Sequence, residues 1–281
     1  MRGIRYVVCD VFTDRPLTGN QLAVFTDARG LDAALMQALA CEMGFAESTF
    51  VLPAEAGGHA RMRIFTPKVE MPFAGHPTLG TAFVVGEATQ LREIVLETGA
   101  GLVPVRLERE GARVVFGWMT QPTPQMVPVA HEEELRAALG VERSELPVEC
   151  YDNGIAHVYV ALPSRAAVAA LRPDLGRLAA VAAGGVNAFA GEGDSWKTRM
   201  FAPGAGVAED AATGSAAGPL AWHLARHGRV PAGQTIRIEQ GAEIGRPSVL
   251  YARAGGPLDA PVIEVGGSAV TVARGEFRLH R

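Results

Sequence analysis

The amino-acid sequence predicts an α/β protein made of two similar halves. Stretches rich in β-branched and aromatic residues alternate with helix-like stretches along the chain. The phrase RIFTP at 63–67 returns as RMFAP at 199–203, and a cluster of small residues leading into an apolar stretch follows both copies. The order of expected elements around the two phrases also matches, which indicates diverged copies of one unit.

The first half is expected to hold strands, two helices and a closing meander. Apolar residues recur every four positions from Leu31 to Met43, and Gly44 then follows as a helix C-cap would. Pro77 falls in the first turn of the second helix, where a missing N–H costs nothing. The expected strands cover 4–13, 21–26, 47–53 and 59–67, the helices 31–44 and 75–88, and the meander 93–118.

The second half follows a proline-rich segment at 120–129, which is the best linker candidate. Helical material at 164–184 is interrupted by Pro173. We therefore expect an N-terminal lobe at 1–122, completed by the last strand at 268–281, and a C-terminal lobe at 123–267. The other expected helices cover 131–140 and 214–228, and the strands 156–162, 198–203, 235–241, 248–254, 261–267 and 269–279.

Composition excludes several classes of protein. The net charge of −4 argues against a nucleic-acid surface, which would show as a basic face. The three cysteines form no CxxC motif or disulfide framework, as expected in a reducing cytosol. Neither a signal peptide nor an uncharged apolar run long enough to cross a membrane is apparent. We expect a soluble cytoplasmic protein.

The two small-residue helix starts predict an anion site. A helix N-terminus carries unpaired N–H groups and partial positive charge, and small residues let a ligand reach them. Two such termini facing one cleft would hold an anionic substrate, with each well-aimed donor worth ~3 kcal/mol to developing negative charge. The structural alternative is that the glycines only permit tight helix packing. These glycines are Gly75, Gly80, Gly214 and Gly218.

Five blocks of sequence resemble the phenazine-biosynthesis isomerase family: GNQLAVF, ESTFVLP, RIFTP…PFAGHPTLG, EDAATGSAAGPLAWHL and EQGAEIGRPS. The resemblance implies the diaminopimelate epimerase-like fold, in which each of two pseudo-symmetric lobes rolls a mixed sheet around a central helix. It also implies an active site between the lobes and a homodimer. The implied reaction moves a proton within a small carboxylate, a dihydro-hydroxyanthranilate in the best-known member, without cofactor or metal.

The same resemblance implies the site residues. Gln21 departs from the family pattern, which usually has proline after Gly-Asn, and it frees one backbone angle and adds an N–H donor next to Asn20. The implied catalytic residues are Glu47, His76 and Asp210, and the implied substrate-binding residues are Asn20, Gly75, Thr213, Gly214 and Ser215.

The chemistry of these residues suits proton transfer. Glu47 lies between apolar segments, where desolvation would raise its pKa into the range of a reversible base, although it could equally be a surface carboxylate. His76 could handle a proton, donate a hydrogen bond or cap its own helix. Asp210 could hold His76 or a substrate amine, or complement a helix dipole. Ser215 has no base adjacent to it in the sequence, so donation to a substrate carboxylate is its better role.

No cofactor or metal is expected. His223 and His227 are four apart on one helix, but HLARH lacks the glutamate of HExxH and an evident third ligand. GAGVAE begins like a dinucleotide fingerprint but lacks its final glycine, and no phosphate-binding P-loop occurs.

The sequence bears on two rival functions. A thiol-based amino-acid racemase of the same fold needs a cysteine at each helix start, whereas Cys9, Cys41 and Cys150 all lie elsewhere. A non-catalytic module that binds small carboxylates remains the alternative from another class. Proton exchange into a bound ligand would separate it from an isomerase.

Overall fold

The computed structural model describes residues 3–182, 184–257 and 259–279. The chain divides into unit 1, Met1–Thr120 with Gly266–Arg281, and unit 2, Gln121–Val265. Each of the two divisions falls two residues before the boundary expected from the sequence. Strands and helices alternate through both units, which confirms the α/β class.

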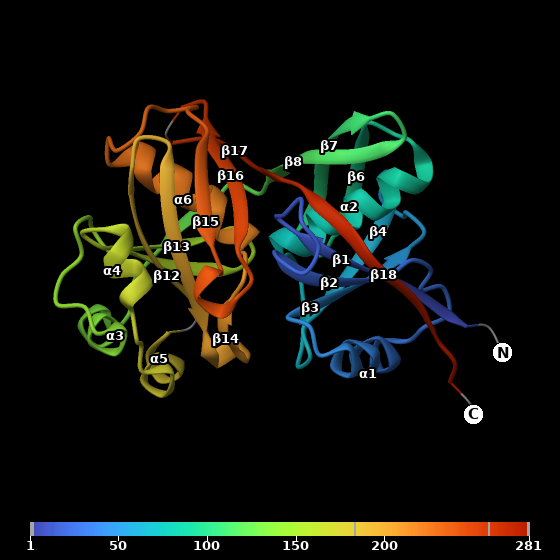
Figure 1. The fold of residues 1–281 in the computed structure, drawn as a ribbon, viewed down its shortest axis with the longest axis horizontal. Coiled ribbons are helices and arrows are strands. Elements are labelled where there is room, and N and C mark those ends of the chain that lie inside the picture. The colour runs from blue at the N-terminus through green and yellow to red at the C-terminus, as the bar shows by residue number, and fades with distance from the viewer. Residues whose placement is uncertain (1–2, 183, 258, 280–281) are drawn as a thin grey trace. The chain divides into compact units, whose positions relative to one another are not determined.

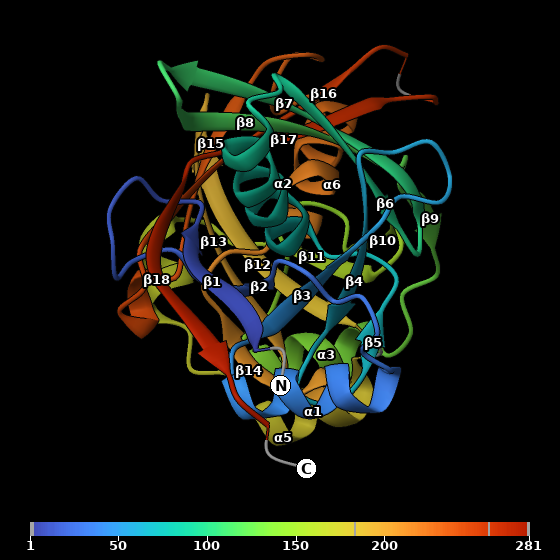
Figure 2. The ribbon, with the colours of Figure 1, turned by 90° about the vertical axis from the view of Figure 1, so that its right-hand side faces the viewer.

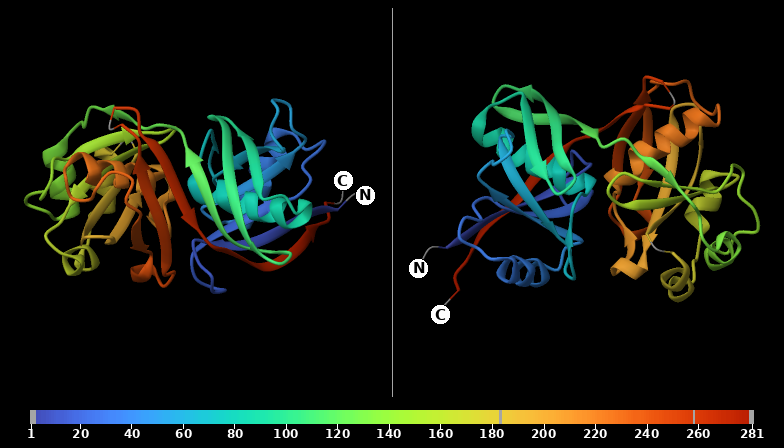
Figure 3. Two further views of the ribbon diagram at one scale, coloured as in Figure 1. Left: turned by 90° about the horizontal axis from the view of Figure 1, so that it is seen from above. Right: turned by 180° about the vertical axis from the view of Figure 1, so that it is seen from behind.

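The strands of unit 1 form one mixed sheet in the order β18-β1-β2-β3-β4-β6-β7-β8. The pairs β2–β3 and β4–β6 are parallel, and the other pairs are antiparallel. Figure 3 shows β18 running beside β1, so the last strand completes this unit. The strands are β1 Ile4–Val11, β2 Asn20–Phe25, β3 Glu47–Leu52, β4 Ala60–Phe65, β5 Glu70–Met71, β6 Glu93–Thr98, β7 Gly101–Glu110, β8 Arg113–Gln121 and β18 Ala269–Phe277.

Helix α2 (Gly75–Thr89) is the core of unit 1. It is mostly buried and contacts β1, β2, β3, β6 and β7, so the sheet wraps around it (Figure 2). A Cβ added to Gly80 would lie 2.6 Å from the Leu22 side chain, so this glycine does permit close packing of the helix on β2. Helix α1 (Ala33–Met43) packs on the opposite face of β3 and β4, against an apolar cluster that includes Phe50 and Phe65.

Unit 2 repeats this topology. Its sheet runs β9-β10-β11-β12-β13-β15-β16, with β11–β12 and β13–β15 parallel. The order and directions from β10 to β16 match those from β1 to β7 in unit 1, which confirms the internal repeat. The strands are β9 Gln125–Val127, β10 Glu149–Asp152, β11 Ala156–Ala161, β12 Gly185–Glu192, β13 Ser195–Ala202, β14 Val207–Asp210, β15 Ile236–Gln240, β16 Ser248–Gly255 and β17 Val262–Gly267.

The helices of unit 2 cover both faces of its sheet. Helix α6 (Gly214–Arg226) is the counterpart of α2, and Gly218 again leaves no space for a Cβ, which would lie 2.3 Å from the Ile263 side chain. Helices α3 (Glu132–Leu139), α4 (Arg165–Ala170) and α5 (Leu175–Val181) form an apolar cluster with the other face of β11 and β12 (Figure 1). Pro173 separates α4 from α5, as predicted.

Five of the strands in the described residues were not predicted from the sequence: β5, β9, β10, β12 and β14. The expected linker at 120–129 contains β9, which pairs with β10, and that linker prediction is therefore wrong for 125–127. β10 has four residues, and β12 begins at a glycine. Such segments carry little periodicity, so only their pairing partners identify them as strands. In the described part of the chain, no helix has the length and apolar character needed to cross a bilayer.

The repeated phrase has the same local structure in both units. Arg63 on β4 forms a two-pronged ion pair with Glu70, at 2.6 Å for both Nε and Nη2, and its guanidinium lies 5.1 Å from the Phe65 ring centroid. Arg199 on β13 pairs with Glu209 at 2.8 and 2.7 Å and lies 5.0 Å from the Phe201 ring. The shared residues therefore tie each phrase to the strand that precedes the central helix.

Candidate active site

Glu47 and His76 meet on the inner face of the unit 1 sheet. Glu47 is the first residue of β3, and side chains at alternate positions of that strand face α2, as the 2.8 Å contact between the hydroxyls of Thr49 and Thr81 demonstrates. His76 is the second residue of α2. Its Nε2 lies 3.5 Å from Glu47 Oε2, and the two side chains are 4% and 14% exposed. The structure thus brings together these two predicted catalytic residues.

Burial keeps the His76 ring neutral. Desolvation lowers the pKa of His76 to about 3, although a hydrogen bond with the backbone of Gln21 opposes the shift. Nδ1 lies 3.1 Å from the amide nitrogen of Asn20, which opens β2. Nε2 has no hydrogen-bond partner within the described ranges, so this atom faces Glu47 with its hydrogen-bonding capacity unused. Asn20, which is predicted to bind substrate, therefore contacts the histidine ring, and Gln21 itself is exposed.

The start of α2 is built without competing anions. Ala74 is its N-cap residue and makes no side-chain capping bond, and the first turn holds no acidic residue. Gly75 follows, and both residues are buried. A helix N-terminus without a capping side chain or carboxylate leaves its dipole available to a bound anion.

Asp210 and Thr213 belong to the loop that leads into α6. Asp210 ends β14, and its Oδ2 accepts a 2.7 Å hydrogen bond from the Thr213 hydroxyl. Gln240 on β15 completes the loop: its Oε1 accepts from the backbone N–H of Thr213 at 3.1 Å, and its Nε2 donates to the backbone carbonyl of Asp210 at 2.9 Å. Gln240 could not be assigned to this loop from the sequence, because it lies 27 positions from Thr213 in the chain.

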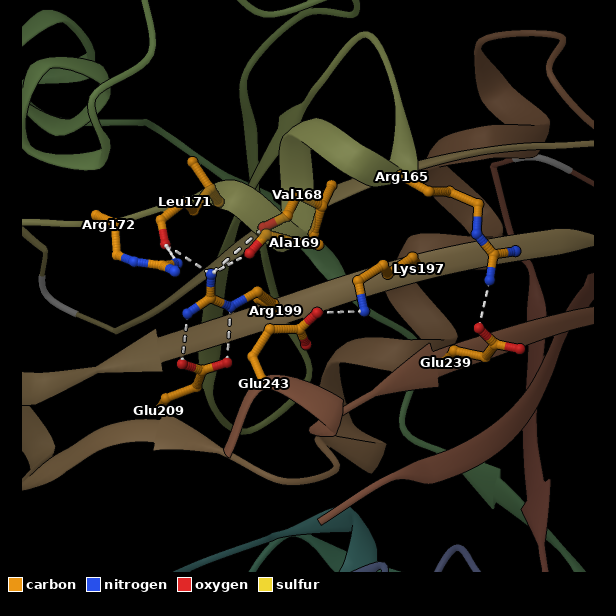
Figure 4. Close-up of polar contacts among 10 residues, drawn as sticks. All are labelled: Arg165, Val168, Ala169, Leu171, Arg172, Lys197, Arg199, Glu209, Glu239 and Glu243. Atoms are coloured by element: carbon orange, nitrogen blue, oxygen red, sulfur yellow. Dashed lines mark hydrogen bonds and ion pairs between the residues drawn. The ribbon is translucent and has the colours of Figure 1, made fainter. Parts of the chain in front are cut away.

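The ion pair of the repeated phrase supports the same loop. Arg199 holds Glu209, the neighbour of Asp210, and also donates from Nη1 to the carbonyls of Val168, Ala169 and Leu171 at the end of α4 (Figure 4). The Arg199 and Glu209 side chains are only 6% and 11% exposed, against 22% and 42% for Arg63 and Glu70. Unit 2 therefore buries this pair more deeply than unit 1.

Ser215 contacts a histidine that the sequence did not pair with it. Ser215 follows Gly214 in the first turn of α6, and its Oγ lies 2.9 Å from Nε2 of His157 on β11. His157 is fully buried, which lowers its pKa to about 4. No base is adjacent to Ser215 in the chain, but one is adjacent in space, 58 positions away. Ser215 itself is 4% exposed.

The repeat shows what replaces Glu47 in unit 2. The phrase aligns β4 with β13, and the strand registers carry this alignment to β3 and β12. Glu47 and Gly185 then occupy equivalent positions, each one residue before the partner of the phrase's phenylalanine. The next strand pairs Leu22 with Glu47 and His157 with Gly185. Unit 2 therefore has no carboxylate at the position of Glu47.

One group of side chains in the described residues has the composition of a metal site. Glu149, His223 and His227 place their ligand atoms within 4.8 Å of one another. Glu149 Oε2 accepts hydrogen bonds from His223 Nδ1 and His227 Nε2 at 3.0 Å each, and from Arg226 Nη1 at 2.9 Å. The Arg226 guanidinium already neutralises this carboxylate, so the cluster is explained as an ionic network that ties α6 to β10. Glu149 is thus the third side chain beside His223 and His227, which the HLARH motif alone does not reveal.

The cysteines lie away from the helix starts. Cys9 is on β1 and Cys150 on β10, both buried, and Cys41 is exposed on α1. Burial raises the pKa of Cys9, and it raises the pKa of Cys150 to about 11. Thiols with raised pKa values are poor bases at neutral pH, which agrees with the exclusion of thiol-based racemisation.

Comparison with known proteins gives a consistent result. Residues 9–275 match the family described as phenazine biosynthesis-like protein. The chain is 52% identical over 276 residues to a trans-2,3-dihydro-3-hydroxyanthranilate isomerase of Pseudomonas aeruginosa, covering 98% of this chain and 99% of the relative. It is 50% identical over 275 residues to the enzyme of that name from Pseudomonas chlororaphis, with the same coverage.

Solved structures extend the likeness to the fold. A PhzF-family phenazine biosynthesis protein of Bacillus anthracis superposes with a TM-score of 0.87 at 27% identity, covering 99% of this chain and 100% of that one. A hydroxyproline epimerase from Agrobacterium vitis gives 0.68 at 14% identity, covering 98% and 92%. The second likeness concerns the fold alone, and it confirms the expected epimerase-like architecture.

Proposed function

Because this chain belongs to the phenazine biosynthesis-like family, we propose that it is a cofactor-independent isomerase of trans-2,3-dihydro-3-hydroxyanthranilate. Two relatives with this printed name are 50% and 52% identical to it over nearly the whole of both chains. The observation that carries the proposal is the pairing of Glu47 with His76 on the inner face of unit 1, where a carboxylate meets a neutral imidazole.

In the proposed reaction Glu47 takes a proton from one ring carbon and returns it to another. The carboxylate acts first as general base and then as general acid, so atoms and charge balance without a second catalyst. His76 is neutral at physiological pH, since its pKa lies far below 7, and its Nε2, 3.5 Å from Glu47 Oε2, is placed to hydrogen-bond the substrate during the reaction. Hydrogen-bond donors around the site stabilise the negative charge that develops on the substrate between the two transfers.

A single base agrees with an isomerase rather than a racemase. A two-base racemase needs proton acceptors on both sides of one carbon, whereas a suprafacial shift uses the same group twice. The position equivalent to Glu47 in unit 2 is Gly185, which has no side chain, and the position equivalent to His76 is Ser215. The repeat therefore supports one acid/base group, and that group is Glu47.

The remaining predicted residues have binding roles in this proposal. Gly214 and Ser215 at the start of α6 bind the substrate carboxylate, while Asp210, which the Thr213 hydroxyl holds in place, binds its amine. Gly75 contributes its backbone at the start of α2. The absence of acidic residues from the first turns of α2 and α6 favours such anion binding.

The experiment follows the proton. The enzyme is incubated with trans-2,3-dihydro-3-hydroxyanthranilate in deuterated water, and substrate loss and product deuteration are followed by NMR. Wild type should turn the substrate over, and Glu47→Gln should lower kcat by ~10²- to 10⁴-fold. Glu42→Gln, an exposed site on α1, is the matched control. Binding without turnover by wild type would contradict the proposal and favour the non-catalytic carboxylate-binding module.

We also propose that the protein is a cytoplasmic homodimer, as the family resemblance implies. Light scattering coupled to size exclusion should give twice the mass of the 29.6 kDa chain. Fractionation of the producing cells should recover the protein with the cytoplasmic markers. A monomer, or recovery in another fraction, would contradict the respective statement.

A further inference from the structure

The buried pair Ser215–His157 has hydrogen-bonding capacity that its own contacts do not use. Ser215 Oγ has one hydrogen to donate and two lone pairs, and within the described ranges it makes one hydrogen bond, to His157 Nε2 at 2.9 Å. The other ring nitrogen, Nδ1, is buried and has no partner among the described residues. The position of the imidazole proton therefore decides the direction of the Ser215 hydroxyl.

The surroundings of His157 favour a proton on Nε2. A proton on Nδ1 would bury an N–H donor with no acceptor, whereas a proton on Nε2 leaves only a lone pair unused on Nδ1. Orphaned donors are the rarer and costlier of the two in protein interiors. In the favoured tautomer His157 donates to Ser215 Oγ, so the serine hydrogen cannot point back at the ring.

The backbone next to Nδ1 holds the ring in this orientation. A Cβ added to Gly185 would lie 2.5 Å from His157 Nδ1, so only glycine leaves room for the imidazole on β11. In unit 1 the equivalent pair is reversed: β2 has the apolar Leu22, and β3 has the long side chain of Glu47. In unit 2 a glycine, Gly185, therefore takes the position of the acid/base residue, and the space beside it is filled by the ring of His157, which reaches Ser215 on α6.

We propose that His157 is a positioning residue, whose Nε2–H donates to Ser215 Oγ and thereby commits the Ser215 hydrogen to the substrate carboxylate. This inference rests on the proposed function, because it explains why the Ser215 hydroxyl donates its hydrogen to the substrate carboxylate. His157 does not itself touch the substrate, since it acts only through the serine.

A double-mutant cycle tests the coupling. Ser215→Ala and His157→Leu should each raise KM for trans-2,3-dihydro-3-hydroxyanthranilate by ~10- to 100-fold, the range for one hydrogen bond to a charged group, with a smaller change in kcat. The double variant should show no larger increase in KM than either single variant, because both substitutions remove the same hydrogen bond. His157→Gln, whose amide nitrogen can still donate, should recover part of the loss. Thermal unfolding of every variant reports folding.

The tautomer is measured without any variant. Long-range proton–nitrogen NMR of the labelled protein should show His157 protonated at Nε2 and not at Nδ1. The ring should stay neutral down to about pH 5, because its pKa is lowered to about 4. His59 is an internal standard for the same tautomer, since its Nδ1 accepts from the backbone N–H of Val95 at 2.9 Å.

The outcomes separate the two proposals. An inactive wild type contradicts the proposed function, whatever the NMR result. If the wild type is active, any one of three results overturns the role of His157 alone. These are an Nδ1–H tautomer, an unchanged KM in Ser215→Ala, and a His157→Leu effect on KM that is just as large in the Ser215→Ala background. An Nε2–H tautomer together with a closed cycle supports it.

Discussion

The two units share a framework and differ in chemistry. Each ties its repeated phrase to the following strand by an arginine that binds a glutamate and lies over a phenylalanine. Each also wraps a sheet around a helix that starts with glycine. At three equivalent positions, however, unit 1 has Leu22, Glu47 and His76, whereas unit 2 has His157, Gly185 and Ser215. The Arg–Glu–Phe contacts within the sheet are thus the same in both units, whereas the residues near the start of the central helix differ.

The largest expected effect is a loss of kcat when the acid/base residue of unit 1 is replaced by its unit 2 counterpart. Glu47→Gly gives unit 1 the residue that unit 2 has, and kcat should fall by ~10²- to 10⁴-fold because the general base is lost. Added acetate should restore part of the rate, since it can occupy the space of the missing carboxylate. Steady-state kinetics with and without acetate check this. Turnover within about tenfold of wild type would assign the base to another residue.

The next effect concerns the framework that both units share. Arg199→Met leaves Glu209 buried without its partner and removes the arginine's hydrogen bonds to three backbone carbonyls, so it should cost ~3–5 kcal/mol of the free energy of unfolding. Arg63→Met breaks a more exposed pair and should cost about 1 kcal/mol or less. Urea denaturation measures both variants. Equal losses would mean that burial does not distinguish the two pairs.

A smaller effect tests the space that unit 2 reserves for His157. Gly185→Ala places a Cβ 2.5 Å from the ring, so it should cost ~1–3 kcal/mol and also raise KM by displacing His157 from Ser215. Gly176→Ala in α5 is the control, because its Cβ would meet nothing closer than 3.4 Å. Thermal denaturation and kinetics are read together. A Gly185→Ala protein with native stability and KM would show that the ring does not need this space.

The smallest effect is on acid stability. The pKa values of His157 and His223 in unit 2 are lowered to about 4, and that of His76 in unit 1 to about 3, from an ordinary value of 6.5. Between about pH 6.5 and these values the unfolded chain binds protons that the folded chain does not, so the free energy of unfolding falls as pH falls.

Unit 2 holds two of these neutral histidines, so acid should loosen it more than unit 1. Amide hydrogen exchange at pH 7 and pH 5, corrected for intrinsic rates, measures the two units separately. Glu149, with its pKa lowered to about 2, contributes stability above its ordinary 4.5 that is lost only below that value, so it does not confuse the comparison at pH 5. An equal loss of protection in both units would contradict this expectation.

Much of the fold could be predicted because it is encoded locally. The helix around Pro77, the break at Pro173 and the strands with β-branched runs follow from the preferences of neighbouring residues. β10 and β12 could not be predicted in this way, because a short strand and one that starts at glycine are stabilised by their partners. The duplication was visible in one short phrase, and the registers of two sheets then confirmed it.

The sequence by itself determined most of the elements, the repeat, the two glycine-led helix starts and the candidate base Glu47. Only the tertiary structure decided which side chains meet: Asn20 with His76, Gln240 with the loop before α6, and His157 with Ser215. The physical reason is range. Propensity and periodicity act between neighbours, whereas these hydrogen bonds join residues 27 to 58 positions apart, whose meeting depends on strand register and helix packing.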